Sequence, residues 1–267
     1  WILSASDDRT ATVWDVATGE PVTQPLVHAA AVVMATYSPD GRWVATGLAD
    51  GTAHVWPTGG GPRARKFEGH RGALTVVRFS PDGKWLATAS EDRTARLWNV
   101  DEGQPVGEVI RHMDGVTWTD FSPNSRLLVT SSGDNRARIW EVPSGKPVGH
   151  PLRHRRTVTR ALFTRDGRRV LTVSLDRTAR VWDALTGEAL GEPLPHDSPS
   201  TRIVLSHDSS RVLTGGWNGR IRLWDTDSGE ALTEWLDLGG PIAAAAMDPS
   251  GERFAAAAPG GVRLWDW

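Results

Sequence analysis

The sequence predicts an all-β chain built from one short unit that repeats seven times. Tryptophan recurs at intervals of 42 residues, with one interval of 41, at Trp14, Trp56, Trp98, Trp140, Trp182, Trp224 and Trp265. A turn sequence related to SPDG keeps the same period, as do histidines at His28, His70, His112, His154 and His196. With 28 glycines, 17 prolines and no sustained 3.6-residue apolar periodicity, the chain favours short strands joined by turns, with essentially no helix.

Each unit is expected to contain four short strands. In the unit that starts at His70, residues 74–79 (LTVVRF) form the first strand and run into SPDG, whose Pro, Asp and Gly suit a tight turn. Residues 85–90 (WLATAS) and 94–98 (TARLW) form the next two strands, separated by another turn. The fourth strand carries Pro105, and because proline is tolerated on an edge strand only, we expect this strand to lie outermost.

Both ends of the chain fall inside a unit. The chain opens on the second strand of one unit (WILSAS) and closes on the third strand of another (VRLWDW). We therefore expect a single domain of seven units, the first and last incomplete, cut from a longer polypeptide, and a parent with more than seven units is equally compatible. The expected boundaries are 1–27, 28–69, 70–111, 112–153, 154–195, 196–237 and 238–267.

Three units carry a set of residues that could suggest a hydrolytic triad. The set is His70, Ser90, Asp92 and Trp98, and the same offsets give His112, Ser132, Asp134 and Trp140, then His154, Ser174, Asp176 and Trp182. A catalytic nucleophile normally occurs once in a domain, held in a cleft. Because this set repeats in three consecutive units, we interpret it as structural and expect no catalytic residue.

In combination these motifs resemble WD40 repeats: a histidine, then V…FSPDG, then S-x-D-x-T, then a strand that ends in Trp-Asp. The resemblance covers the whole chain and implies a seven-bladed β-propeller of four-stranded antiparallel blades, with the first and last blades incomplete. It also implies a hydrogen-bonded tetrad, in which histidine contacts aspartate and is linked through serine to the indole N–H. Blades that depart from the pattern, at Leu48, Gly216, Asn218 and Leu238, are expected to be less stable than blades three to five.

Composition argues against several classes of function. The net charge is −2, so we expect no binding of nucleic acid or of an anionic membrane, and no apolar run is long enough to span a membrane. The densest basic run, residues 153–169, is expected to be divided between the two ends of its blade. The absence of cysteine suits the cytoplasm, and one histidine per blade cannot converge on a metal ion, so we expect no metal and no cofactor.

Residues that contact a partner are expected at the end of the blades that carries the histidines and aspartates. Neighbouring side chains vary there from blade to blade, and Trp and Arg are common anchors of interfaces. The alternative is that the tryptophan packs between blades and the arginines are only solvated. The candidate residues are Arg71, Glu91, Trp118, Arg160, Arg202 and Trp217.

We expect a non-catalytic scaffold that binds protein or peptide partners, present as a monomeric domain within a longer chain. Segments such as TGEALGEPLPH resemble WD40 arrays of large bacterial proteins, often attached to a Ser/Thr kinase or NTPase domain, which would make this chain a sensor arm. No unit carries an inserted loop, which argues against catalysis. Two alternatives remain: a propeller enzyme with a site in its channel, and a purely structural element that drives oligomerisation.

Overall fold

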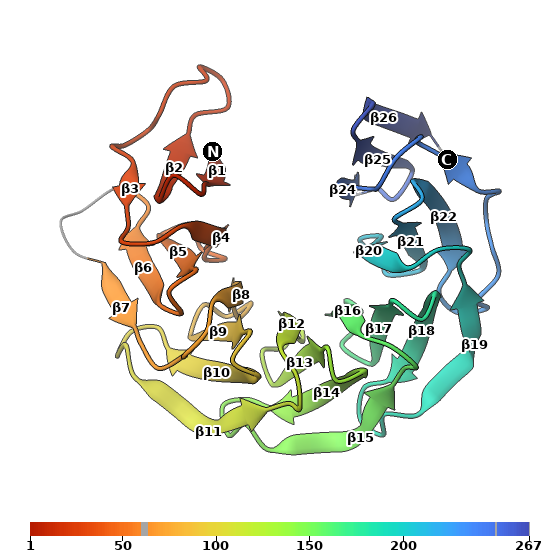
Figure 1. The fold of residues 1–267 in the computed structure, drawn as a ribbon, viewed down its shortest axis with the longest axis horizontal. Helices are drawn as coiled ribbons and strands as arrows, with labels where there is room; N and C mark the ends of the chain where they lie inside the picture. Colours follow the sequence, from red (N-terminus) through yellow and green to blue (C-terminus); the bar gives the residue numbers. More distant parts are fainter. Residues whose placement is uncertain (60–63, 249, 267) are drawn as a thin grey trace. The chain divides into compact units, whose positions relative to one another are not determined.

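The computed structural model describes residues 1–59, 64–248 and 250–266, and within these ranges the chain forms strands and turns but no helix. No described segment is therefore a helix that could cross a membrane. The strands form seven antiparallel sheets that follow one another along the chain (Figure 1). Five sheets have four strands, and the first and last have three. The prediction of an all-β, seven-bladed propeller with incomplete first and last blades is confirmed.

The strands follow the expected repeat. Blades one to three contain β1 (Ile2–Ala5), β2 (Thr10–Trp14) and β3 (Leu26–Val27); β4 (Val32–Tyr37), β5 (Trp43–Leu48), β6 (Ala53–Pro57) and β7 (Arg65–Phe67); and β8 (Leu74–Phe79), β9 (Trp85–Ser90), β10 (Thr94–Asn99) and β11 (Pro105–Arg111). Blades four and five contain β12 (Val116–Phe121), β13 (Leu127–Ser132), β14 (Arg136–Glu141) and β15 (Pro147–Arg153), then β16 (Val158–Phe163), β17 (Arg169–Ser174), β18 (Thr178–Asp183) and β19 (Ala189–Pro195). Blades six and seven contain β20 (Ser200–Leu205), β21 (Arg211–Gly216), β22 (Arg220–Asp225) and β23 (Leu236–Asp237), then β24 (Ala244–Met247), β25 (Arg253–Ala258) and β26 (Gly261–Asp266).

The chain divides into two compact units. Unit 1 comprises Trp1–Ser132 with Trp140–Pro147, and unit 2 comprises Gly133–Ile139 with the chain from Val148 onward. The single domain and the seven boundaries given above remain a prediction.

Blade three, in unit 1, illustrates how the repeated sequence folds. Ser80 Oγ donates to Asp82 Oδ1 over 2.6 Å and accepts from the backbone N–H of Trp85 over 2.9 Å, which closes the SPDG turn between β8 and β9. The strand order is β11-β10-β9-β8, so β11, which begins at Pro105, lies at the edge of the sheet. The predicted outermost position of the proline-bearing strand is correct, because proline has no N–H to offer a further strand.

Apolar side chains of successive blades fill the core of each unit. In unit 1, Val76, Leu97 and Ile110 of blade three pack with Val116 and Leu128 of blade four, and all five are at most 1% exposed. Burying one such side chain stabilises the fold by about 1.5–3 kcal/mol. Unit 2 has an equivalent layer between blades five and six, formed by Leu171, Val173, Val181, Leu194, Ile203, Val212 and Trp224. These layers fix the strands, and the strands fix the turns that carry the polar residues.

Candidate functional site

A chain of hydrogen bonds runs through the interior of blade three. Because a carboxylate only accepts, His70 Nδ1 donates to Asp92 Oδ2, over 3.0 Å, and His70 Nε2 accepts from Thr88 Oγ1 over 2.8 Å. The same threonine oxygen accepts the indole N–H of Trp98 over 2.9 Å. The side chains of His70 and Asp92 are only 1% and 12% exposed, so these bonds satisfy groups that water cannot reach easily.

The hydroxyl that links histidine to tryptophan belongs to Thr88, so the predicted role of Ser90 was wrong. Ser90 Oγ instead donates to Gly72 O over 2.9 Å and accepts from the backbone N–H of Asp92 over 3.0 Å. It therefore ties the loop after the histidine to the turn after β9. In the register between β9 and β10, Thr88 is the diagonal neighbour of Trp98, and Ser90 lies roughly 7 Å further along the strand.

Blade five repeats the arrangement with its own residues. His154 Nδ1 lies 2.9 Å from Asp176 Oδ2, and His154 Nε2 lies 2.7 Å from Thr172 Oγ1. Trp182 donates its indole N–H to the same threonine oxygen over 2.7 Å. Ser174 again bonds main-chain groups and not the histidine. The threonine, and not the serine, is the link here too.

Blade four shares these bonds. His112 Nε2 and Trp140 Nε1 both contact Thr130 Oγ1, at 2.7 and 2.8 Å. Ser132 donates to a main-chain carbonyl over 2.9 Å, and Asp134 accepts from the guanidinium of Arg138 over 2.8 Å. A signal for the linking hydroxyl is present in the sequence, because a hydroxyl residue recurs two positions before the serine position, at Ser4, Thr46, Thr88, Thr130, Thr172 and Thr214.

The electrostatics around His70, Asp92 and Ser90 fit a structural hydrogen-bond network better than a serine nucleophile paired with a general base. Burial acts to raise the pKa of Asp92, but hydrogen bonds from Thr94, from the backbone N–H of Arg71 and from His70 outweigh it, so the pKa lies below its usual range. Burial lowers the pKa of His70, against the pull of the aspartate. Because Ser90 makes its hydrogen bonds to main-chain groups, no base is placed to activate it.

Two blades that depart from the motif keep a buried histidine. His28 packs against the rings of His54 and Trp56, at 5.3 and 5.4 Å between centroids, and burial lowers its pKa to about 4. His196 packs against Trp235 at 5.3 Å, and burial lowers its pKa to about 4 as well. Both histidines are therefore neutral packing residues near pH 7.

The structure separates the candidate contact residues. Arg71 and Glu91 are exposed in blade three, and Arg160 is half-buried on β16. Trp118 on β12 is half-buried and packs against the core shared by blades three and four, with the guanidinium of Arg78 5.1 Å from its ring centre. Packing between blades, the alternative considered for this tryptophan, is the arrangement observed.

Arg202 and Trp217 lie together at a hollow of about 520 Å³ in unit 2. Trp217 is 54% exposed and lies in the turn between β21 and β22. Arg202, on β20, donates through Nε to Ala243 O over 2.9 Å, which holds its guanidinium beside the hollow. The other walls are apolar side chains: Pro241, Ile242, Ala243, Ala258 and Pro259. An aromatic face, a cation and apolar walls suit the side chains of another protein.

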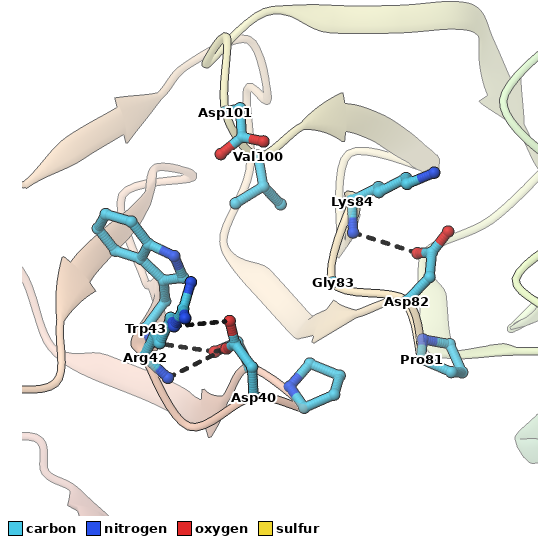
Figure 2. Close-up of a pocket in the computed structure, with 11 residues that line it drawn as sticks. Asp40, Arg42, Trp43, Pro81, Asp82, Gly83, Lys84, Val100 and Asp101 are labelled. Carbon is cyan, nitrogen blue, oxygen red and sulfur yellow. Dashed lines mark hydrogen bonds and ion pairs between the residues drawn. The ribbon is translucent and has the colours of Figure 1, made fainter.

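A second hollow, of about 470 Å³, lies in unit 1 between the hairpin turns of blades two and three (Figure 2). Its carboxylates close their own turns: Asp40 accepts from the backbone N–H of Arg42 over 3.0 Å, and Asp82 from that of Lys84 over 3.1 Å. We assign no ligand to it. Throughout the described ranges, no group of three or more His, Asp or Glu side chains is placed to hold a metal ion.

Comparison with known proteins identifies the repeat. Five segments match the family described as WD domain, G-beta repeat, at residues 19–57, 61–99, 103–141, 145–183 and 190–225, and each segment ends one residue after a repeated tryptophan. Among solved structures, the chain is similar to the computationally designed Ika8 protein, with a TM-score of 0.88 and 24% identity over 99% of this chain and 80% of that one. This second likeness concerns the fold alone. No curated protein matches the chain.

Proposed function

Since the chain belongs to the WD40-repeat family, whose members typically serve as non-catalytic scaffolds for protein interactions, we propose that it binds an extended peptide segment of a partner protein at the hollow beside Trp217 and Arg202. The observation that carries the proposal is an indole 54% exposed beside apolar walls. Trp and Arg are enriched among the residues that contribute most to interfaces, and their burial supplies the affinity. No catalytic group is part of this function.

The chemistry of the hollow specifies the kind of segment it would accept. Its volume of about 520 Å³ accommodates one or two side chains, and the walls from Pro241 to Ala243 and from Ala258 to Pro259 are apolar. We expect an apolar side chain of the partner to pack against the face of Trp217. The guanidinium of Arg202, held at the rim by its bond to Ala243 O, then donates to an acceptor on the segment.

The context of the chain is also a proposal. The repeat sequences resemble those of large bacterial proteins, so we place the chain in the cytoplasm as a monomeric docking arm of a longer protein, such as a Ser/Thr kinase or an NTPase. The net charge of −2 supports a protein partner over nucleic acid. Light scattering on the purified chain tests the monomeric state.

The docking proposal is tested by selecting peptides from a phage-displayed library on the wild-type chain and measuring their affinities by fluorescence polarisation. We expect Trp217→Ala to weaken the selected peptides at least tenfold, or about 1.4 kcal/mol. Leu185→Ala is the matched control, because Leu185 is a large apolar residue of the same unit, 68% exposed, that does not line the hollow. Selected peptides whose affinity is unchanged by Trp217→Ala, or equally reduced by the control, would contradict the proposal.

A further inference from the structure

Three arginines surround another hollow of unit 2, of about 410 Å³. It is lined by Arg155, Arg156, Leu175, Asp176, Arg177 and Pro199. All three arginines are exposed, and within the described part of the chain none of their guanidinium groups forms an ion pair. Three unpaired cations around one small hollow create a local positive potential that the net charge of the chain does not reveal.

The carboxylate that lines this hollow, that of Asp176, already accepts hydrogen bonds from groups of blade five. Asp176 accepts from His154 over 2.9 Å, from the backbone N–H of Arg155 over 2.9 Å and from the hydroxyl of Thr178 over 2.7 Å. Burial acts to raise the pKa of Asp176, but these hydrogen bonds lower it well below its usual range. Three guanidinium charges against one carboxylate leave a net charge of +2, and the carboxylate oxygens are occupied by other donors.

Among the blades that retain the histidine and both turns, only blade five has arginine at all three of these positions around the hollow. The positions of Arg155, Arg156, Leu175 and Arg177 are filled in blade two by Ala29, Ala30, Ala49 and Gly51; in blade three by Arg71, Gly72, Glu91 and Arg93; in blade four by Met113, Asp114, Gly133 and Asn135; and in blade six by Asp197, Ser198, Trp217 and Gly219. Glu91 therefore offsets the charge of the arginines in blade three, and Asp114 in blade four and Asp197 in blade six each stand where blade five has an arginine. The fold does not require arginine at these positions, so the cluster in blade five is free to serve binding.

The backbone beneath the three arginines is fixed. Arg177 has φ +69° in its turn, and its carbonyl accepts the backbone N–H of His196 over 2.9 Å. The carbonyl of Arg156 accepts from Ser174 Oγ over 3.0 Å, and the N–H of Arg155 donates to the aspartate. Fixed anchor points reduce the entropy that the guanidinium groups lose when they converge on an anion.

We propose that this cluster, Arg155, Arg156 and Arg177, binds the phosphate group of a phosphorylated side chain in a partner protein. A phosphomonoester carries nearly two negative charges and three terminal oxygens, which matches three forked guanidinium donors, whereas a carboxylate has a single charge and two oxygens. Leu175 and Pro199 provide apolar walls for the carbons that carry the phosphate. Nucleic acid is disfavoured because strands separate this cluster from the basic turn that carries Arg165 and Arg168: β16 lies between that turn and Arg155 and Arg156, and β17 lies between it and Arg177, so no continuous basic stripe forms.

The phosphate site lies next to the docking hollow. The carbonyl of Pro199, which lines the phosphate hollow, accepts the backbone N–H of Trp217 over 3.1 Å. One segment could therefore place a phosphorylated residue among the arginines and an apolar residue against Trp217. The phosphate site rests on the proposed function in one respect, because it assumes that the phosphate belongs to a peptide segment of a partner protein.

The test uses a library of peptides with a fixed phosphothreonine, and the selected sequences are also made with threonine and with glutamate. We expect the phosphorylated form to bind at least tenfold more tightly than either, with inorganic phosphate as a competitor. The variant Arg155→Met/Arg177→Asn places at both positions the residues that blade four has there, Met113 and Asn135, so the fold tolerates them. It should abolish the preference, and Arg71→Met/Arg93→Asn in blade three should preserve it.

Each outcome separates the two proposals. If the selected peptides depend on Trp217 but bind equally with and without phosphate, the phosphate site is refuted and the docking hollow stands. If the phosphate preference depends on Arg155 and Arg177 while Trp217→Ala has no effect, the docking hollow is refuted and the phosphate site stands. Equal losses in the blade-three control, or tighter binding of a duplex oligonucleotide than of the phosphopeptide through the same arginines, would overturn the phosphate site.

Discussion

The hydroxyl of Thr88 should stabilise blade three more than that of Ser90, although both serve the same network. In Thr88→Val the side chain keeps its shape but loses the oxygen that bonds both His70 and Trp98. The threonine is 1% exposed, so water cannot replace it. Each buried polar group left without a partner costs about 1–3 kcal/mol, and two are left, so we expect a loss of roughly 3 kcal/mol in the free energy of unfolding.

Ser90→Ala is the matched comparison. It removes bonds to the carbonyl of Gly72 and the N–H of Asp92, two half-buried residues that water reaches more easily, so we expect a loss of about 1 kcal/mol. Urea unfolding followed by tryptophan fluorescence gives the total change, and hydrogen exchange of the amides in β8–β10 locates it in blade three. A loss for Ser90→Ala that equals or exceeds that for Thr88→Val would refute the assignment of the linking hydroxyl to threonine.

Three further perturbations follow from the same structure. Burial lowers the pKa of His196 to about 4, against 6.5 in the unfolded chain. The stability that the buried neutral imidazole contributes is therefore complete above pH 6.5 and is lost as the pH falls to 4. His196→Phe should remove about 3 kcal/mol of that pH dependence of the unfolding free energy, measured by urea unfolding across this range. Leu128→Ala, in a fully buried site, should cost about 2–5 kcal/mol in the same assay. Gly145→Ala should destabilise the fold by well over 1 kcal/mol, because a Cβ there would lie 2.6 Å from a backbone oxygen. Gly103→Ala is the control, because Gly103 has a similar positive φ but open space around it, and it should cost about 1 kcal/mol. Equal losses for the two variants would contradict the steric argument.

The architecture was predictable because its signals are local in the sequence. The 42-residue period, the alternation within each strand and the SPDG turns specify strands and turns from neighbouring residues alone. Pro105 specified which strand lies at the edge, since a residue without an N–H cannot continue the ladder. The incomplete first and last blades followed from the strand on which each end of the chain falls. The repetition of the Ser–His–Asp set in three consecutive blades favoured a structural interpretation over a catalytic one.

Other features depended on which residues face one another across strands and between blades. Thr88 and Ser90 are two residues apart on one strand, and only the register with β10 determines which of them reaches Trp98. Arg202 and Trp217 are brought beside the prolines of blade seven by packing between sheets, so their shared hollow has no local signal in the sequence.

The sequence by itself determined the repeat, the strands and the identity of the variable turn residues. Only the tertiary structure decided which of those residues share a surface. Arg155 and Arg177 are separated by more than a full hairpin in the chain, yet they line one hollow with Pro199 of the next blade. The physical reason is that strand propensity and turn geometry act over a few residues, whereas a binding surface is assembled from turns that come together only after the blades have packed.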